Sequence, residues 1–288
     1  MIKGLLYILL TATVFTTLEP VSKLIATQIN PFAITFIRFF IGGAMLLPFS
    51  ILQIRKKNIH LDKKDFLSIS LLGVLCICVS MVLLQFAVLK ADSPALIAII
   101  FSSNSVFTIL LSAVILKDKL TAVKGVAIGL CIAGVLVCTD FSSGSNIFSV
   151  VLAVLSSITF SLYTVLSKKF MTKVSGIIQT GFSFFIGSVI LLAALLVTGI
   201  DFIGGVNSEN IMHLVYLGVA VTGIGYWSYF KAMEKTSAMA ASLVFFIKPI
   251  MTPFAAFFIN GITPQGKVFV ALVLVLAGSS LATFKAKT

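Results

Sequence analysis

Long apolar segments alternate with short polar ones along the whole chain, and this pattern predicts membrane-spanning helices. A transmembrane helix needs about 20 predominantly apolar residues. The first five predicted spans are residues 4–25, 31–53, 66–89, 94–116 and 122–139. The second five are residues 146–167, 176–198, 210–233, 238–259 and 266–284. A strand barrel needs short segments of alternating polarity, whereas these runs are apolar on nearly every face, so we expect an all-α polytopic membrane protein.

The chain also contains an internal repeat, because residues 4–101 align without a gap with residues 149–246. Matching positions include Ser22-Lys23 with Ser167-Lys168, Phe39-Phe40-Ile41-Gly42 with Phe184-Phe185-Ile186-Gly187, Leu72-Gly73-Val74 with Leu217-Gly218-Val219, and Phe101 with Phe246. We therefore predict two five-helix repeats, residues 1–142 and 143–288. The first span belongs to its repeat and no small-residue cleavage site follows it, so we expect it to be a retained helix.

An odd number of spans per repeat predicts that the two copies have inverted topology in the membrane. Inverted repeats are typical of secondary transporters, whose substrate site lies near the bilayer midplane between the repeats. Exchange between the conformations of two similar halves then converts an outward-open state into an inward-open one. The repeat therefore favours transport by alternating access.

Composition agrees with a membrane protein, since 59% of the residues are hydrophobic, 10% are charged and the mean hydropathy is +1.16. The net charge of +12 could indicate a nucleic-acid partner, but most Lys and Arg residues lie in short loops that one orientation places on the cytoplasmic side. This distribution predicts that both termini are cytoplasmic, and it predicts the lipid bilayer, not nucleic acid, as a partner. The expected location is the cell membrane, namely the bacterial cytoplasmic membrane.

The sequence gives no sign of a metal site, a cofactor or catalysis. Cys76 and Cys78 are two residues apart, so on a helix they point to well separated faces. His60 and His213 have no ligand-like spacing, and the chain contains no complete nucleotide-binding loop of the form G-x-x-x-x-G-K-[ST], no H-E-x-x-H and no G-x-S-x-G motif. We expect no metal, no cofactor, no direct use of ATP and no enzymatic activity.

Several positions carry a resemblance to a known family. They are Lys23 closing the first span, Pro31 opening the second, Arg38 within it, Pro249 in the ninth span, and Gly125, Gly129 and Gly134 in the fifth. With ten spans in five-plus-five order, the chain resembles the EamA-type permeases of the drug/metabolite transporter superfamily. That resemblance implies a transporter of small metabolites.

The chain also departs from the family pattern. Lys117-Asp118 and Asn260-Gly261 stand where spans four and nine of the family often end in Gly-Glu, and Phe15-Thr16 stands where the first span often has Trp-Gly. Because the family carries amino acids, drugs, nucleobases and other metabolites, these departures leave the substrate open.

Charges that occur in only one repeat are candidates for substrate binding or coupling. Glu19 aligns with Thr164, Arg38 with Ser183 and Lys248 with Ser103, whereas Lys23 and Lys168 match and are expected to be scaffold. A charge at the bilayer centre costs about 2.5–3.5 kcal/mol, so such side chains normally face the bundle interior or a cavity.

Glu19 is the acid well inside a span, and Pro20 beside it favours a local kink. Burial disfavours the charged form of a carboxyl group, so Glu19 could bind a proton or a cationic group of the substrate; the alternative is an ion pair with Lys23 at i+4. Lys248 precedes Pro249 and could bind a carboxylate or pair with Glu19. Arg38 fits a role in folding or gating better than one in binding.

Aromatic and amide side chains complete the set of candidates. Tyr226, Trp227 and Tyr229 in the eighth span and Tyr163 in the sixth could line a cavity, or they could be interfacial anchors. Asn104 lies mid-span in the fourth span and could line a cavity or bond a neighbouring helix.

Spans five and ten lack interior charges and carry small residues, so we expect them to support the bundle and to offer a homodimer contact. The leading hypothesis is a permease or exporter for a small organic metabolite, such as an amino acid or related zwitterion, with protons as a candidate coupling ion. The alternatives are an exporter of cationic drugs or quaternary amines and, from another class, a membrane channel.

Overall fold

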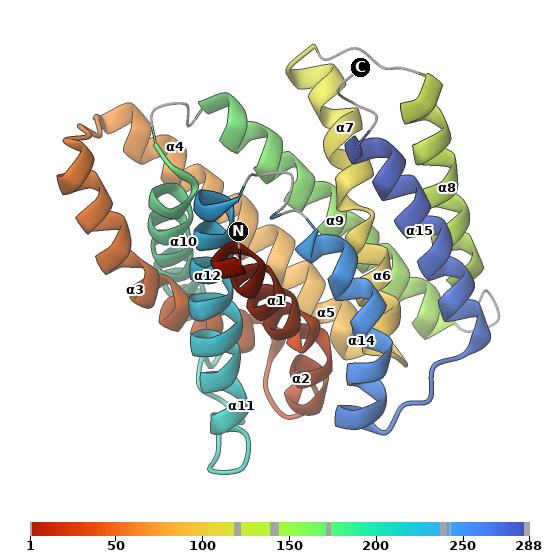
Figure 1. Cartoon of the computed structure of the whole chain (residues 1–288). Helices are drawn as coiled ribbons and strands as arrows, with labels where there is room; N and C mark the ends of the chain where they lie inside the picture. Colours follow the sequence, from red (N-terminus) through yellow and green to blue (C-terminus); the bar gives the residue numbers. More distant parts are fainter. Residues whose placement is uncertain are drawn as a thin grey trace.

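The computed structural model of the protein describes residues 2–117, 122–138, 144–170, 174–236, 241 and 243–284. In these residues the chain is helical, with no strand (Figure 1). The first repeat contributes α1 (Ile2–Thr16), α2 (Leu18–Ile25), α3 (Pro31–Lys57), α4 (Lys63–Gly73), the π-helix η1 (Val74–Met81), α5 (Val82–Lys90), α6 (Pro94–Ser102), α7 (Asn104–Ile115) and α8 (Ala122–Cys138). The second contributes α9 (Gly144–Phe170), α10 (Gly176–Thr198), α11 (Ile211–Tyr216), the π-helix η2 (Leu217–Ile224), α12 (Gly225–Lys235), α14 (Val244–Asn260) and α15 (Gly266–Phe284).

Within the described residues, seven helical segments are long and apolar enough to cross a membrane. They are Ile2–Ile25, Pro31–Lys57, Lys63–Lys90, Pro94–Ile115, Ile147–Phe170, Gly176–Thr198 and Ile211–Lys235. Three shorter apolar helices, Ala122–Val137, Val244–Asn260 and Gly266–Leu281, lie where spans five, nine and ten are predicted. The chain is thus an all-helical, multi-pass membrane protein, while ten complete spans and cytoplasmic termini stay predictions. The repeat boundary predicted at residues 142 and 143 and the start of the ninth span at 238–240 lie outside the described residues.

Four predicted spans are interrupted helices in the described chain, and one of them, the fourth span, is broken at Ser103 between α6 and α7. Proline has no N–H, so Pro20 cannot bond to the carbonyl of Thr16, and α1 ends at Thr16. The predicted kink beside Glu19 is therefore present. Spans three and eight each contain a π-helical stretch, η1 and η2, at nearly the same place in the two repeats. Long π-helical stretches are rare and are often found near functional sites.

The helices α3 and α10, which are the same span of the two repeats, run antiparallel along each other. The hydroxyl of Ser50, late in α3, donates to the carbonyl oxygen of Ile177, early in α10, at 2.9 Å. Phe39, earlier in α3, packs on Phe184, later in α10, with ring centroids 4.7 Å apart. Antiparallel packing of repeat-equivalent helices is the arrangement that an inverted repeat requires.

Two further crossings are also related by the repeat. A Cβ built on Gly73 would lie 3.1 Å from the backbone nitrogen of Gly187, and one built on Gly42 would lie 3.1 Å from the carbonyl oxygen of Gly218. In the sequence repeat Gly73 aligns with Gly218 and Gly42 with Gly187. The same close glycine contact is therefore made twice, once on each side of a pseudo-two-fold axis.

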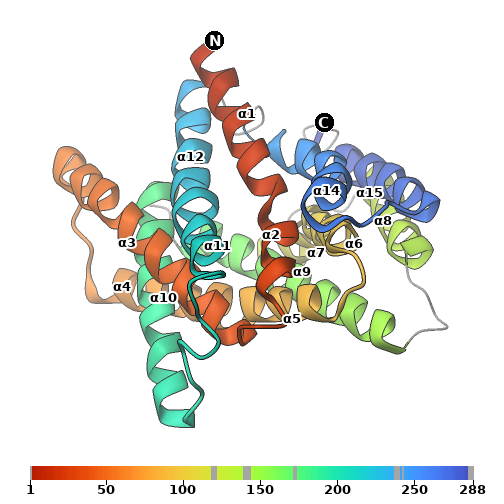
Figure 2. The same cartoon turned by 90° about the horizontal axis from the view of Figure 1, so that it is seen from below.

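The helices α8 and α15 form a separate antiparallel pair at one end of the molecule, away from α3 and α10 (Figures 1 and 2). Gly134 of α8 packs on Ala271 of α15, and Gly278 of α15 packs on Ala127. A Cβ on Gly125 or Gly129 would have no atom of the described chain within 4 Å, so these two glycines face away from the bundle. The dimer contact expected at this pair stays a prediction.

Candidate functional site

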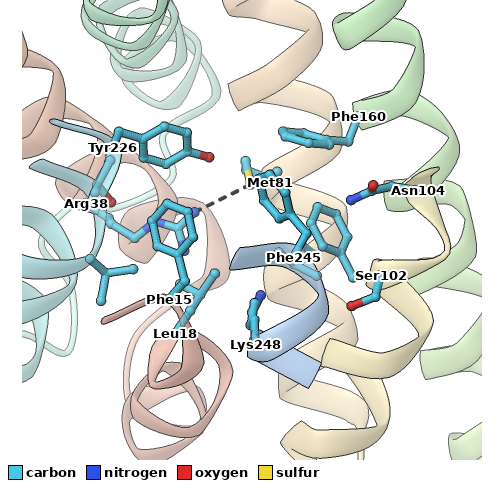
Figure 3. Close-up of a pocket in the computed structure, with 14 residues that line it drawn as sticks. Phe15, Leu18, Arg38, Met81, Ser102, Asn104, Phe160, Tyr226, Phe245 and Lys248 are labelled. Carbon is cyan, nitrogen blue, oxygen red and sulfur yellow. Dashed lines mark hydrogen bonds between the residues drawn. The ribbon is translucent and has the colours of Figure 1, made fainter. Parts of the chain in front are cut away.

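A central pocket lies between the two repeats, and both contribute to its wall. It is lined by Phe15, Leu18, Arg38, Met81, Leu84, Phe101, Ser102, Asn104, Phe160, Val221, Thr222, Tyr226, Phe245 and Lys248 (Figure 3). Phe15 and Phe160 are equivalent positions of the sequence repeat, and so are Met81 and Tyr226. Because equivalent residues face each other across the pocket, it lies on the pseudo-two-fold axis.

The pocket is narrow in this conformation. Its volume is about 40 Å³, which is room for about three water molecules. Drug-sized ligands occupy pockets of several hundred Å³. The walls must therefore move apart before an organic molecule can enter.

A buried ion pair closes one side of this pocket. Lys248 Nζ donates to Glu19 Oε1 at 2.6 Å, with Glu19 fully buried and Lys248 only 5% exposed. Of the partners considered for Glu19, the structure selects Lys248. The alternative pair with Lys23 is wrong, because Lys23 Nζ instead donates to the carbonyl oxygens of Leu89, at 3.1 Å, and Ala91, at 2.5 Å.

Two proline-distorted helices place the pair. Glu19 follows the break between α1 and α2, and Lys248 lies on α14 directly before Pro249. Since Pro249 has no N–H, the helical hydrogen bond to the carbonyl of Phe245 is missing, and Phe245 lines the pocket. Lys248 Nζ also lies 5.7 Å from the ring centroid of Phe101, at the outer range of a cation–π contact.

Arg38 enters the same pocket from α3 and lacks a carboxylate partner among the described residues. It is 4% exposed, and its Nη2 donates to the thioether sulfur of Met81 at 3.5 Å (Figure 3). Its Cζ lies 4.3 Å from the ring centroid of Phe39. Its Nε atom has no hydrogen-bond partner in the described chain. A residue that stabilises the fold would be expected to bond its neighbours, but the Arg38 guanidinium makes few hydrogen bonds and lies at a pocket wall. These contacts therefore do not support the expected role in folding.

The other candidates divide into two groups. Asn104 and Tyr226 line the pocket, and the Tyr226 ring packs on Phe15 at 5.2 Å between centroids. Tyr163 is buried outside this lining, where its hydroxyl accepts from Gln179 Nε2 at 3.5 Å. Trp227 and Tyr229 are not among the residues that line this pocket, and a role for them in binding stays a prediction. Tyr229 packs on Phe230 and Phe245, and Trp227 borders a different cavity.

Most of the apolar lining was not among the predicted site residues. Phe15, Met81, Leu84 and Phe101 had no polar signal to mark them. The sequence repeat could have identified one pair of lining residues, because Phe15 aligns with Phe160. In the structure the rings of Phe101 and Phe160 pack with centroids 5.3 Å apart.

A second, wider cavity of about 540 Å³ opens at one end of the helices. Its wall comprises Phe49, Leu52, Gln53, Lys56, Lys57, Ile177, Trp227, Lys231 and Glu234. Lys56, Lys57 and Lys231 are among the basic residues that the sequence predicts on the cytoplasmic side. The wide cavity therefore lies at the predicted cytoplasmic end.

The opposite end is tied together by hydrogen bonds between the repeats. Asn210 Nδ2 donates to Gln28 Oε1 at 2.9 Å, and Asn260 Nδ2 donates to the carbonyl oxygen of Pro20 at 3.0 Å. The contacts of Lys23 with Leu89 and Ala91 lie in the same region. Contacts between the repeats thus close this end of the molecule, while the wide cavity lies at the other end.

Comparisons with known proteins agree with this architecture. The profile of the EamA-like transporter family matches twice, over residues 2–139 and 147–284. A protein of Clostridium kluyveri described as an uncharacterised transporter is 34% identical over 286 residues, covering 96% of this chain and 92% of that protein. A transporter of the same description from Archaeoglobus fulgidus is 28% identical over 224 residues, covering 78% of each chain.

A solved structure described only as a crystal structure of a protein has the same fold. It superposes with a TM-score of 0.66 at 17% identity and covers 99% of this chain and 97% of its own.

Proposed function

The chain belongs to the EamA-like transporter family, and we propose that it is a secondary transporter that moves a small organic metabolite across the membrane by alternating access. The observation that carries this proposal is the central pocket, which lies between the repeats and is lined by Lys248, the cation of the buried Glu19–Lys248 ion pair. Charged side chains inside membrane-spanning helices are costly and mark substrate or ion pathways.

The proposed topology has ten spans, two inverted five-helix repeats (residues 1–142 and 143–288) and both termini in the cytoplasm of a bacterial cell. It is supported by the antiparallel packing of α3 on α10 and by the repeated contact of Gly73 with Gly187 and of Gly42 with Gly218. On this topology, the 540 Å³ cavity beside Lys56 and Lys231 opens to the cytoplasm. The conformation is then inward-facing, with its outer end closed by the hydrogen bond between Asn210 and Gln28.

The Glu19–Lys248 ion pair could be opened during transport by a cargo molecule or a proton that takes the place of one partner. A zwitterion such as an amino acid can offer an ammonium group to Glu19 as the pair separates, and a carboxylate to a cation of the pocket wall. A proton on Glu19 would also release Lys248, which would couple transport to the proton gradient. Export of cationic amines is less well supported, because the two charged side chains that line the pocket, Arg38 and Lys248, are both cations.

The test is uptake into proteoliposomes that contain the purified protein, with a panel of radiolabelled amino acids and organic acids. We expect saturable, counter-transported uptake in the wild type and its loss in Glu19→Gln and Lys248→Ala. Imposing a pH gradient should change the wild-type rate. If both variants transport every accepted solute as well as the wild type, the ion pair does not belong to the transport site.

A further inference from the structure

We infer that the cargo carries a carboxylate group and that Arg38 is the residue that binds it. This inference rests on the proposed function, because it assigns a substrate class to the central pocket. The group that Arg38 would recognise is a carboxylate attached to an apolar body. Either a simple organic acid or an apolar amino acid supplies it.

The first argument is the unused hydrogen-bonding capacity of Arg38. A guanidinium has five N–H donors in a planar fork and stays charged at any physiological pH. In the described chain, the side chain makes one hydrogen bond, to the weak sulfur acceptor of Met81, and Nε has no partner. Arg38 is also 96% buried, being 4% exposed. A buried, unpaired charge is costly, and a carboxylate accepting two parallel hydrogen bonds is the anion that fits the fork.

The second argument is the charge balance of the site. Glu19 lies 2.6 Å from Lys248 and compensates that ammonium group. The charge of Glu19 also acts on Arg38, so two cations, Lys248 and Arg38, share one carboxylate among the described residues around the pocket, and one positive charge is left over. One carboxylate would neutralise it, whereas an amine would add a second uncompensated positive charge. An anionic group of the cargo is therefore expected to bind most favourably at Arg38.

The remaining wall indicates the body of the cargo. Phe15, Phe101, Phe160 and Leu84 are apolar, and on the far side from Arg38 the lining includes the uncharged polar side chains of Ser102 and Asn104 (Figure 3). Aromatic walls of this kind accept aliphatic or aromatic groups. The expected cargo is a small carboxylate with an apolar tail and little further charge.

The experiment is a thermal-shift titration of the full-length protein in detergent with two matched series of probes. The aromatic series is phenylacetate, phenylalanine and phenethylamine, and the aliphatic series is isovalerate, leucine and isoamylamine. Stabilisation grows with the ratio of ligand concentration to Kd. We expect the carboxylates, the amino acids or both to raise Tm, and the amines not to do so. Phenylacetate and isovalerate acting alone identify simple acids, and phenylalanine and leucine acting alone identify amino acids.

Arg38→Met and Arg38→Lys separate binding from a structural role. If Arg38 binds the cargo, Arg38→Met removes an unpaired buried charge, so Tm without ligand stays the same or rises while the ligand shift is lost. Arg38→Lys keeps the charge but not the fork, and should weaken binding about tenfold or more. If Arg38 has only a structural role, both variants should have a lower Tm without ligand. The fraction of each variant that still folds should then bind the ligand with the wild-type Kd.

The inference is overturned if no carboxylate or amino acid stabilises the wild type, if the amines do, or if Arg38→Met binds as tightly as the wild type. The proposed function fails on a different measurement, namely when a cysteine in the pocket cannot be reached from both sides of the membrane. If the pocket cysteine is reached from both sides but no carboxylate binds, this inference is rejected while the proposed function stands.

Discussion

Phe39 and Phe184, which occupy the same position in the two sequence repeats, pack edge to face with their ring centroids 4.7 Å apart. Their neighbours Phe40 and Phe185 are also equivalent and stack at 5.4 Å. A residue can meet its own repeat equivalent only near the axis that relates the repeats. The pseudo-two-fold axis therefore passes between α3 and α10, next to the pocket wall formed by Arg38 and Tyr226.

The glycine crossings beside this axis give the first prediction. We expect Gly73→Leu and Gly187→Leu to prevent normal folding, because a side chain at either position would meet backbone atoms of the opposite helix. Overpacking typically costs about 1–3 kcal/mol, and more where backbone must move. The measurement is the yield of monodisperse protein by size-exclusion chromatography, followed by Tm.

Gly129→Leu is the matched control, because its Cβ would have no atom of the described chain within 4 Å. This variant should be purified like the wild type. Equal loss of folded protein in all three variants would mean that the glycine contacts between the repeats are not specific constraints.

The buried ion pair gives the second prediction. Removing one partner leaves an uncompensated charge, so Glu19→Gln and Lys248→Met should each destabilise the protein by about 3–5 kcal/mol. The double variant Glu19→Gln/Lys248→Met removes both charges and should recover most of the lost stability. A double-mutant cycle of unfolding free energies in detergent measures this. Additive losses in the double variant would show that the two side chains do not interact.

The positions of the helices could largely be predicted from the sequence, because apolar runs of membrane length have few alternatives to a helix. The break at Glu19 was also predictable, since Pro20 lacks the N–H that a continuous helix needs. The π-helical stretches η1 and η2 could not be predicted. Their sequences are ordinary apolar runs, and their winding depends on packing against other helices.

The site was only partly predictable for a related reason. Intramembrane charge identified Glu19, Arg38 and Lys248, because buried charges are rare and costly. Which charges pair is a tertiary property, and the sequence left both Lys23 and Lys248 open as partners of Glu19, of which the structure uses Lys248. The aromatic side chains were harder still. Tyr226 and Trp227 are adjacent in sequence, yet only Tyr226 lines the central pocket.

The proposed topology gives the third prediction. In a variant whose native cysteines are replaced, Lys57→Cys should react with a membrane-impermeant thiol reagent only from the cytoplasmic side. Asn207→Cys, in the loop before α11, should react only from the outside. Labelling of intact cells and of inside-out vesicles measures both. The opposite pattern would invert the assignment of the two ends, and reaction of both positions from the same side would exclude the ten-span arrangement.

The fourth prediction is that a disulfide bond across the closed outer end traps the protein in one conformation. Gln28 and Asn210 join the loop after the first span to the start of the eighth through a 2.9 Å hydrogen bond. A disulfide in Gln28→Cys/Asn210→Cys should hold this end shut. Oxidation should then stop transport and reduction should restore it, whereas unchanged flux through the oxidised variant would mean that the outer end does not open during transport.

The measurement that tests alternating access most directly is the accessibility of one cysteine in the central pocket. Ser102→Cys, in the cysteine-free background, lies in the pocket wall opposite Arg38. We predict that an impermeant reagent labels it from both sides of the membrane, and that the oxidised Gln28→Cys/Asn210→Cys lock abolishes labelling from the outside while labelling from the cytoplasm persists. Labelling from one side only in the unlocked protein, or outside labelling that survives the lock, would contradict a central site that opens alternately to the two sides.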